Sequence, residues 1–496
     1  MKVLIICTEK LPVPPVRGGA IQTYIAGAVP TLSKKHSITI LGRTDPDLPN
    51  EETIDNIHYV RTEGGLLETY RKGVINYLKS NPSFDLIHIF NRPRLVNPVR
   101  DSTPNARIVL SMHNDMFQPQ KIDQEEGALA IEQVDKIITI SNYIGHAITN
   151  FFPQAAPKLR TIYSGVDLNR FVPSYSDKAR PIRQSIRNEY QLQNKKVILF
   201  AGRLSANKGA DVLVRAIPEV AKKHPDAALV LMGGKWFSDD GVTDYIAYVR
   251  ALAQRSQVPI ITTGFVAPDK IQEWFAAADV FVCPSQWQEP LARVHYEAMA
   301  AGLPIVTTDR GGNTEVIDLN KNGLIVENPE DPSEFAKHIT NLLSNPSICK
   351  EMGQYGRKIA EQKYNWSRVV SDIENVWNEI EYNIQNNIEI GSQEVVETTM
   401  ESEQFDVIEQ VNEEVRPEVV VPLETQEDVL PQQSITEEHQ NVVDVTERKR
   451  RRKRNRNRNR SKVRRKQNSS SGQILVSFSG QRKYFTSGEL KRQNIR

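Results

Sequence analysis

Short apolar runs alternate with segments of helical spacing over about the first 380 residues of the chain. The earliest runs lie at 2–7, 37–41, 85–90, 107–112 and 136–141; they are rich in β-branched residues and lack polar alternate positions. Strands that are buried on both faces of a parallel sheet have this pattern. Residues 1–172 are therefore predicted to form one α/β domain.

A second set of apolar runs follows a polar interval at about 173–195, which is predicted to be a linker with a short helix. These runs lie at 196–204, 227–234, 260–266, 279–285 and 303–309, again with helix-length spacing between them. Alternating strands and helices predict parallel sheets with right-handed crossovers. The sequence therefore predicts two Rossmann-like, doubly wound domains, 1–172 and 173–364, that face each other across a cleft.

A further helix is expected at 365–384. Its apolar residues are spaced to form one stripe, namely Val369, Ile373, Val376, Trp377 and Ile380. Packing of this stripe on a domain core is the favoured interpretation, and a surface for a partner helix is the alternative.

The chain has a net charge of +2, which conceals two charged blocks of opposite sign. Residues 385–447 are rich in glutamate and poor in aromatic residues, so this acidic linker is expected to remain disordered. Residues 448–466 contain fourteen Lys and Arg residues and begin a basic tail that runs to residue 496. Within this tail, apolar and polar residues alternate over 472–487, which predicts a small hairpin around Ser479-Gly480.

Neither a disulfide framework nor a membrane segment is expected. Cys7, Cys283 and Cys349 are far apart and follow no metal-binding or disulfide pattern, which favours a reducing compartment. The opening segment MKVLIICTEK has too short an apolar core for a signal peptide. No stretch approaches the roughly 20 apolar residues of a transmembrane helix, so a cytoplasmic location is expected.

The segment LFAGRLSANKGADVL, at 199–213, has the features of an anion site. A strand ends at Gly202, Arg203 follows its carboxyl end, and Lys208-Gly209 precedes the next helix. Because ligands bind at the carboxyl ends of strands and helix N-termini favour anions, these two cations predict a diphosphate site. An ordinary surface Arg and Lys at a sharp turn are the alternative. The segment is neither a Walker A loop nor a G-x-G-x-x-G turn, which disfavours a nicotinamide oxidoreductase.

The segment QWQEPLARVHYEAMAAGLPIV, at 286–306, places two carboxylates around a helix start. Glu289 is expected at the end of a loop that faces the cleft, and Glu297 within the following helix. A carboxylate that accepts two hydrogen bonds suits a vicinal diol, such as that of a ribose or a hexose. The alternative is an ordinary ion pair between Arg293 and Glu297, which stand at i and i+4.

Taken together, these motifs resemble the family-4 glycosyltransferases, which have the GT-B fold, over about residues 1–382. The resemblance rests on six landmarks in the same order along the chain: Gly18-Gly19, His113, SGVDLNRF at 164–171, GRLSANKG, the Glu289/Glu297 pair and GGNTEVI at 311–317. The segment TEKLPVPPVRGGAIQ is similar to the corresponding sequence in a narrower branch of this family, which is associated with bacterial spore coats.

The resemblance implies a role for each candidate site residue. Arg203 and Lys208 would hold the diphosphate of a nucleotide-sugar donor, such as a UDP- or GDP-hexose, and Glu297 would bind its ribose. Glu289 and His113 would face the transferred sugar, while Gly18 and Gly19 would let backbone N–H groups approach the phosphate or the acceptor. Because fixed cations stabilise the departing diphosphate as a metal ion otherwise would, no essential metal or other cofactor is expected. In this fold the helix at 365–384 would return to the N-terminal domain.

Several alternatives remain open at these positions. His113 also fits a core histidine, and its neighbour Asn114 is an equally good polar contact, whereas Asp115 is a weaker candidate. Glu315 also fits the start of a helix. Family members commonly have Pro-Phe-Gly after the first glutamate, whereas this chain has Pro290-Leu291-Ala292. Since alanine adds a methyl group where glycine allows close backbone approach, this departure leaves donor geometry open.

The predicted function is retaining transfer of a hexose to a hydroxyl acceptor, in the synthesis of spore-coat or cell-surface polysaccharide or glycoconjugate. The alternative is a structural or interaction protein of the spore coat, which keeps the fold but functions through its charged tail. The basic tail would attract polyanions such as cell-wall polymers or acidic coat proteins, which predicts tethering to a coat, membrane or wall surface. Because the tail lacks interleaved aromatic residues, sequence-specific nucleic-acid binding is not expected.

Overall fold

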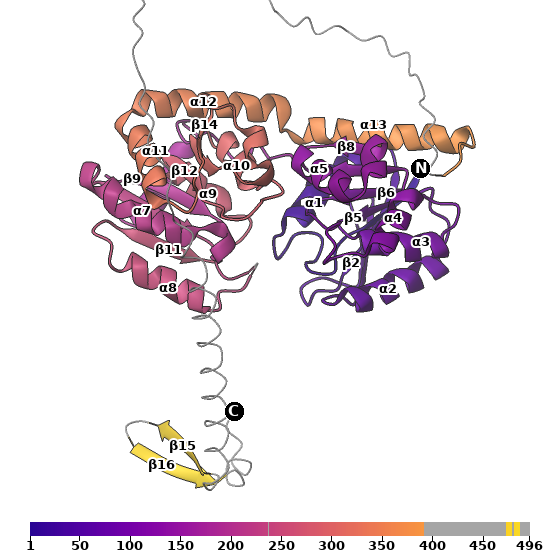
Figure 1. The fold of residues 1–496 in the computed structure, drawn as a ribbon, viewed down its shortest axis with the longest axis horizontal. Helices are drawn as coiled ribbons and strands as arrows, with labels where there is room; N and C mark the ends of the chain where they lie inside the picture. Colours follow the sequence, from indigo (N-terminus) through magenta and orange to yellow (C-terminus); the bar gives the residue numbers. More distant parts are fainter. Residues whose placement is uncertain (237, 391–472, 479–480, 487–496) are drawn as a thin grey trace, which may run out of the picture. The chain divides into compact units, whose positions relative to one another are not determined.

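The computed structural model describes residues 1–236, 238–390, 473–478 and 481–486 (Figure 1). The chain divides into two units, Met1–Thr399 and Met400–Arg496, and each is described by itself. Among the described residues, no helix has both the length and the apolarity that crossing a bilayer requires. The predicted acidic linker beyond residue 390 and the basic run at 448–466 lie outside the described residues.

The N-terminal domain is built on an eight-stranded sheet in the order β3-β4-β2-β1-β5-β6-β7-β8. Every neighbouring pair is parallel except β3 and β4, which are antiparallel. The strands are β1 (Lys2–Ile6), β2 (Ser37–Arg43), β3 (Glu51–Ile54), β4 (Ile57–Thr62), β5 (Leu86–Phe90), β6 (Arg107–Met112), β7 (Lys136–Thr139) and β8 (Leu159–Thr161). The helices are α1 (Ala20–Leu32), α2 (Leu67–Ser80), α3 (Val96–Ser102), α4 (Gln124–Gln133) and α5 (Asn142–Phe151), with 3-10 turns η1 (Pro93–Leu95) and η2 (Pro153–Lys158).

The C-terminal domain carries a six-stranded, fully parallel sheet in the order β11-β10-β9-β12-β13-β14. Its strands are β9 (Lys196–Ala201), β10 (Ala227–Met232), β11 (Ile260–Gly264), β12 (Val280–Cys283), β13 (Ile305–Thr308) and β14 (Gly323–Val326). Its helices are α6 (Ala179–Glu189), α7 (Ala210–Lys223), α8 (Asp244–Ala253), α9 (Ile271–Ala277), α10 (Val294–Ala300), α11 (Pro332–Ser344) and α12 (Pro346–Lys363), with 3-10 turns η3 (Ala206–Lys208) and η4 (Gly311–Val316).

Both sheets confirm the predicted doubly wound parallel architecture. Four strands do not stand out as buried apolar runs in the sequence, namely β3, β4, β8 and β14. β3 and β4 form an antiparallel pair at one edge, and β4 alternates between buried and half-buried residues. β8 is a three-residue edge strand without a fully buried residue, and β14 is an edge strand of four residues. The edge strands β3 and β8 lack a continuous apolar run because much of their surface stays exposed. β14 is largely buried, and its shortness kept it from standing out.

Each sheet reverses its winding at one point. In the N-terminal domain the chain runs from β1 to β2 and later returns to place β5 on the other side of β1. In the C-terminal domain the same reversal separates β9 from β12. Ligands of doubly wound sheets bind in the crevice outside the carboxyl ends of the two strands that flank this point. The loops that follow β1, β5, β9 and β12 are therefore the expected walls of a site.

The helix α13 (Trp366–Gln385) returns from the C-terminal domain and lies along the N-terminal domain (Figure 1). It begins at Asn365, whose side chain accepts a hydrogen bond from the backbone N–H of Arg368 at 2.9 Å. Its apolar stripe belongs to the N-terminal core, where Val369, Trp377 and Ile380 are each 0% exposed. The helix α13 thus ties the two domains together.

Close packing at the start of α13 depends on two glycines from distant segments. A Cβ atom on Gly27 of α1 would lie 2.3 Å from the Trp366 ring, and one on Gly165 would lie 2.7 Å from it. Neither position has room for a side chain while this ring is present. Trp366 is therefore wedged between the N-terminal domain and the segment that crosses between the domains.

The second unit contains two described strands, β15 (Gln473–Phe478) and β16 (Gln481–Thr486), which pair antiparallel. They lie on either side of Ser479-Gly480, where the alternation in the sequence predicts a hairpin. Residues 479 and 480 themselves are outside the described residues.

Replacing Trp377 by Ala should lower the free energy of unfolding by about 3–5 kcal/mol, because the variant leaves a cavity in the N-terminal core. Tyr382→Ala is the matched control, since Tyr382 lies on the same helix but is 45% exposed; its effect should stay within about 0.5 kcal/mol. Urea denaturation followed by circular dichroism measures both. Equal small losses in the two variants would contradict the role of α13 in tying the domains together.

Candidate active site

A cavity of about 710 Å³ is lined by both domains of the first unit. Its walls come from the loops after β1, β5, β6, β9 and β12, as the reversal points of the two sheets lead one to expect. All of the predicted site residues line it, namely Gly18, Gly19, His113, Arg203, Lys208, Glu289 and Glu297. The fold thus brings together residues that are far apart in sequence.

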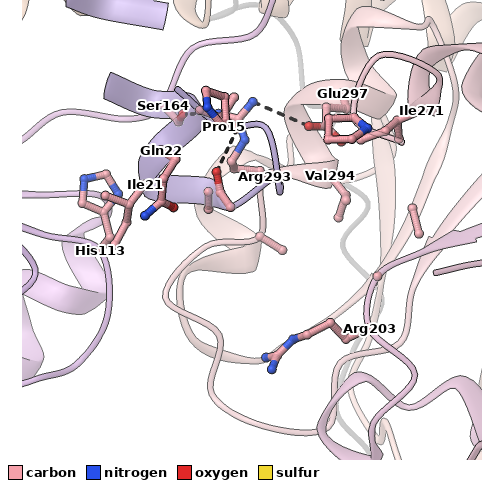
Figure 2. A pocket seen from close by; sticks show the side chains of 18 of the residues that line it. Pro15, Ile21, Gln22, His113, Ser164, Arg203, Ile271, Arg293, Val294 and Glu297 are labelled. Carbon is pink, nitrogen blue, oxygen red and sulfur yellow. Dashed lines mark hydrogen bonds and ion pairs between the residues drawn. The ribbon is translucent and has the colours of Figure 1, made fainter. Parts of the chain in front are cut away.

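Arg203 follows Gly202 at the end of β9 and extends into the cavity (Figure 2). Its guanidinium lies over the Trp236 ring, 4.5 Å from the ring centroid, and no described residue forms an ion pair with it. Burial lowers the pKa of Arg203, and the charge of Glu289 opposes this shift. Since an arginine remains charged at neutral pH even so, the side chain presents a fixed cation to the cavity.

Lys208 ends the 3-10 turn η3 and forms an ion pair with Glu289, which lies in the loop after β12. The next residue, Gly209, has a φ of 68°. A Cβ atom there would lie 2.0 Å from the carbonyl oxygen of Pro284, so this close approach requires glycine. The β9 and β12 loops are thereby packed together, with the cation and the carboxylate side by side.

Two further residues hold the Glu289 carboxylate, and sequence reasoning missed both. Trp287 donates from its indole Nε1 to Glu289 Oε1 at 2.7 Å, and Ser285 Oγ donates to the same oxygen at 3.0 Å. Lys208 also bonds this oxygen, whereas Oε2 accepts no hydrogen bond from a described residue and is not fully shielded from solvent. One carboxylate oxygen is anchored and the other remains available to the cavity. A tryptophan so close to the glutamate was the signal in the sequence.

Glu297 is 8% exposed and lies in α10, where Arg293 Nη2 is 3.5 Å from its Oε1. The ion pair that was the alternative interpretation is therefore present, and Glu297 lines the cavity as well. Burial raises the pKa of Glu297, while the charges of Arg293 and Arg170 oppose the rise. Arg293 also donates from Nη1 to Ser164 Oγ at 2.8 Å, so it joins α10 to the interdomain crossover (Figure 2).

The departure from Pro-Phe-Gly has a structural counterpart. Ala292 lines the cavity, and its backbone N–H donates to Asn313 Oδ1 at 3.1 Å. This N–H group is already paired within the protein. In this protein the Ala292 N–H is therefore bonded to Asn313 rather than left free for a sugar.

On the N-terminal side, Gly18 and Gly19 precede α1 with φ values of 82° and 112°. A Cβ atom on Gly19 would lie 2.2 Å from Gln22 Oε1, and Gly19 supplies no side-chain cap to the helix. The first N–H groups of a helix lack intrahelical partners. The start of α1 therefore offers backbone donors at the wall of the cavity.

His113 follows β6, and its backbone N–H and that of Asn114 donate to Asn91 Oδ1 at 3.0 and 2.9 Å. Its ring packs edge-on against Tyr24, with 4.9 Å between the ring centroids. Burial lowers the pKa of His113 to about 3, and the charge of Arg293 adds to this shift. The imidazole is thus neutral at physiological pH. Asn114 also lines the cavity, so both candidates at this strand end reach it.

A buried ion pair between Glu9 and Arg92 supports the same wall and was also missed. Arg92 Nε and Nη2 donate to the two Glu9 oxygens at 2.6 and 2.9 Å, and Arg92 lines the cavity. Burial raises the pKa of Glu9, but the hydrogen bonds and charge of Arg92 outweigh it and leave the pKa below its ordinary value. The two residues follow β1 and β5, at the reversal point of the sheet.

Gly311 and Gly312 support the Glu289 loop from behind. The N–H of Gly312 donates to the carbonyl oxygen of Glu289 at 2.8 Å, and a Cβ atom on Gly311 would lie 2.0 Å from that oxygen. Glu315 does not begin an α-helix but lies in the 3-10 turn η4. Among the described residues, no group of three or more His, Cys, Asp or Glu side chains is arranged to hold a metal ion.

Comparison with known proteins matches both domains to glycosyltransferases. The family model described as Glycosyltransferase Family 4 matches residues 18–170, and that described as Glycosyl transferases group 1 matches residues 182–359. Spore coat protein SA of Bacillus subtilis is 44% identical over 377 residues, covering 76% of this chain and 99% of that protein. The putative glycosyltransferase YtcC of the same organism is 43% identical over 380 residues, covering 77% of this chain and 92% of that protein.

Solved structures of low sequence identity share the fold. Sucrose-phosphate synthase from Thermosynechococcus elongatus aligns with a TM-score of 0.64 at 20% identity, covering 77% of this chain and 99% of that one. Anabaena HepE in complex with UDP-glucose aligns with a TM-score of 0.61 at 20% identity, covering 76% of this chain and all (100%) of that one. Both family models and the coverage of the two Bacillus proteins agree with the two-domain architecture. The chain therefore belongs to glycosyltransferase family 4 and has the GT-B fold.

Proposed function

We propose that this glycosyltransferase transfers a hexose, with retention of anomeric configuration, from a nucleoside diphosphate donor such as a UDP- or GDP-hexose to a hydroxyl acceptor. The proposal rests mainly on one observation. The C-terminal wall of the cavity combines the Arg203 cation, which has no ion-pair partner among the described residues, with two carboxylates, Glu289 and Glu297. A diphosphate and two hydroxyl-rich rings are the ligand that matches these three groups.

In this proposal, each group has one role. Arg203 and Lys208 hold the diphosphate and stabilise the negative charge that develops as it leaves. Because these cations are fixed, the departure needs no divalent metal. Glu297 accepts hydrogen bonds from the ribose hydroxyls, and the available Oε2 of Glu289 faces the transferred sugar.

The N-terminal wall completes the site. The neutral ring of His113 contacts the same sugar. The Gly18 N–H donates to the Pro15 carbonyl oxygen at 2.8 Å, so the N–H of Gly19 and those of the first turn of α1 are the backbone donors that approach a phosphate or the acceptor. The bond between the anomeric carbon and the diphosphate oxygen breaks as the bond to the acceptor oxygen forms, through an oxocarbenium-like transition state, and the proton of the acceptor hydroxyl passes to the departing diphosphate oxygen. We assign no side chain of the enzyme as a covalent nucleophile in this transfer.

We further propose that the product belongs to a spore coat or to another cell-surface polysaccharide or glycoconjugate. The support is the 44% identity to a protein named Spore coat protein SA. A purely structural coat role is less favoured, because a scaffold has no need for the cations and carboxylates that line the cavity. The basic run at 448–466 would tether the enzyme to an anionic surface.

Arg203→Ala should lower turnover by about 2–4 kcal/mol of transition-state stabilisation, and Lys208→Ala should have an effect of the same order. Both variants should also bind nucleoside diphosphates more weakly, which isothermal titration with UDP and GDP measures. Arg215→Ala is the matched control, because Arg215 lies on the outer part of α7 in an exposed pair with Asp211. Transfer at the wild-type rate in both purified site variants would refute the diphosphate assignment.

Donor binding should weaken as pH falls, because the ionised Glu297 carboxylate accepts from two hydroxyls through both oxygens, whereas protonation turns one of these oxygens into a donor. Burial raises the pKa of Glu297 and the Arg293 charge opposes this, so Arg293→Leu should move the loss of binding to higher pH. Arg293→Lys, which keeps the positive charge, is the control and should move the curve less. The dissociation constant of the donor, measured at several values between about pH 5 and pH 8, reports the shift. Identical pH dependence in wild type and both variants would contradict the role of Glu297.

A chain truncated after Ile390 should keep its transferase activity and lose association with anionic particles at low salt, because it lacks the basic run. It retains α13 and the contact from Arg107 to the Ile388 carbonyl oxygen. Co-sedimentation with anionic vesicles or teichoic-acid-coated beads, at low and high salt, measures the association. Equal retention of both chains would end the tethering hypothesis, and loss of activity on truncation would assign the tail to the active site.

A further inference from the structure

Glu315 of the C-terminal domain reaches the N-terminal domain. Its carboxylate accepts hydrogen bonds from the first two backbone N–H groups of α5: Asn142 N donates to Oε2 at 2.8 Å and Tyr143 N to Oε1 at 2.7 Å. The hydroxyl of Tyr163 also donates to Oε2, at 2.9 Å. A carboxylate of one domain thus satisfies N–H groups at the start of a helix of the other, where the helix dipole also favours negative charge.

Ser141 makes a second connection at the same helix start. It is the N-cap of α5, and its Oγ accepts a hydrogen bond from the N–H of Ile144 at 3.3 Å. The same hydroxyl donates to the carbonyl oxygen of Pro290 at 2.6 Å, and Ser141 is 0% exposed. Pro290 directly follows Glu289 in the chain. The N-cap of an N-terminal helix therefore bonds the loop that carries a proposed active-site carboxylate.

These two connections act on one closely packed part of the C-terminal domain. The turn that carries Glu315 is bonded to the Glu289 loop through Gly312 N, at 2.8 Å from the Glu289 carbonyl oxygen. A Cβ atom on Gly312 would lie 2.3 Å from the Pro290 carbonyl oxygen and 3.0 Å from the Ser141 Cβ. The three segments leave no space for a side chain there. A shift of α5 against the C-terminal domain would consequently disturb both Glu315 and the Glu289 loop.

We propose that Glu315 and Ser141 are positioning residues, which form an interdomain clasp that holds Glu289 and His113 at the separation needed to face the same sugar. The inference rests on the proposed function. The clasp acts on the arrangement of the domains and not on the donor, because Arg203, Lys208 and Glu297 all belong to the C-terminal domain. Loss of the clasp should therefore affect transfer while leaving nucleotide binding in place.

The test compares Glu315→Ala and Ser141→Ala with Asp123→Ala in the full chain. Asp123 is the N-cap of α4 and accepts a hydrogen bond from the N–H of Glu126 at 2.8 Å. Its removal costs a helix cap of the same kind as that of Ser141, but no bond between the domains. Thermal unfolding identifies any variant whose fold is lost.

Three measurements follow. The dissociation constant for the nucleoside diphosphate should stay within about twofold of wild type in all variants. The transfer kcat of Glu315→Ala should fall roughly ten- to a hundredfold, since small displacements of reacting groups cost rates of this order. Its radius of gyration from solution scattering should exceed that of wild type, and Asp123→Ala should match wild type in both respects.

Glu315→Gln keeps the side-chain shape and one acceptor oxygen, so it should recover part of the lost kcat; it also replaces Glu315→Ala if that variant does not fold. Wild-type kcat and scattering in both Glu315 variants would overturn the clasp. Loss of nucleotide binding in Glu315→Ala would overturn it too, because Glu315 would then belong to the donor site. A wild-type chain that binds no nucleoside diphosphate would contradict the proposed function, and the scattering comparison would still decide the clasp.

Discussion

The relative position of the two sheets is the constraint on which the cavity depends, because neither domain supplies all of its walls. The burial of α13 in the N-terminal core opposes separation of the domains, since pulling the helix away would expose Trp377 and its apolar neighbours to water. The crossover at Ser164-Gly165 provides a second connection, which Arg293 bonds directly. With the domains joined in this way, loops from both sheets can form one site.

The cavity keeps charged groups at low solvent exposure by pairing most of them. Glu9 pairs with Arg92, Lys208 with Glu289, and Arg293 with Glu297. Burying an unpaired charge is costly, so these pairs stabilise the charged forms inside the protein. Arg203 differs from them in lying over the Trp236 ring rather than against a carboxylate. That difference is the basis for proposing a diphosphate as the ligand of this wall.

Much of the fold and site could be predicted from the sequence, because the central strands of parallel sheets are continuous apolar runs and ligand loops follow their carboxyl ends. Arg203, Lys208 and Glu289 could be predicted as site residues for this reason, and the structure places all three at the cavity. The edge strand β8 could not be predicted, since its short sequence carries no continuous apolar run. Glu315 could not be assigned either, because its partners Asn142 and Tyr143 lie on the other domain and spacing along the chain does not report such contacts.

Trp366 couples three positions that are distant in sequence. Its ring occupies the space that side chains at Gly27 and Gly165 would need. A substitution at either glycine is therefore compatible with the fold only after the indole has been replaced by a smaller group. In evolutionary terms, the three sites form one unit of epistasis: a side chain at either glycine is expected to be tolerated in a chain that lacks the indole and not in one that keeps it.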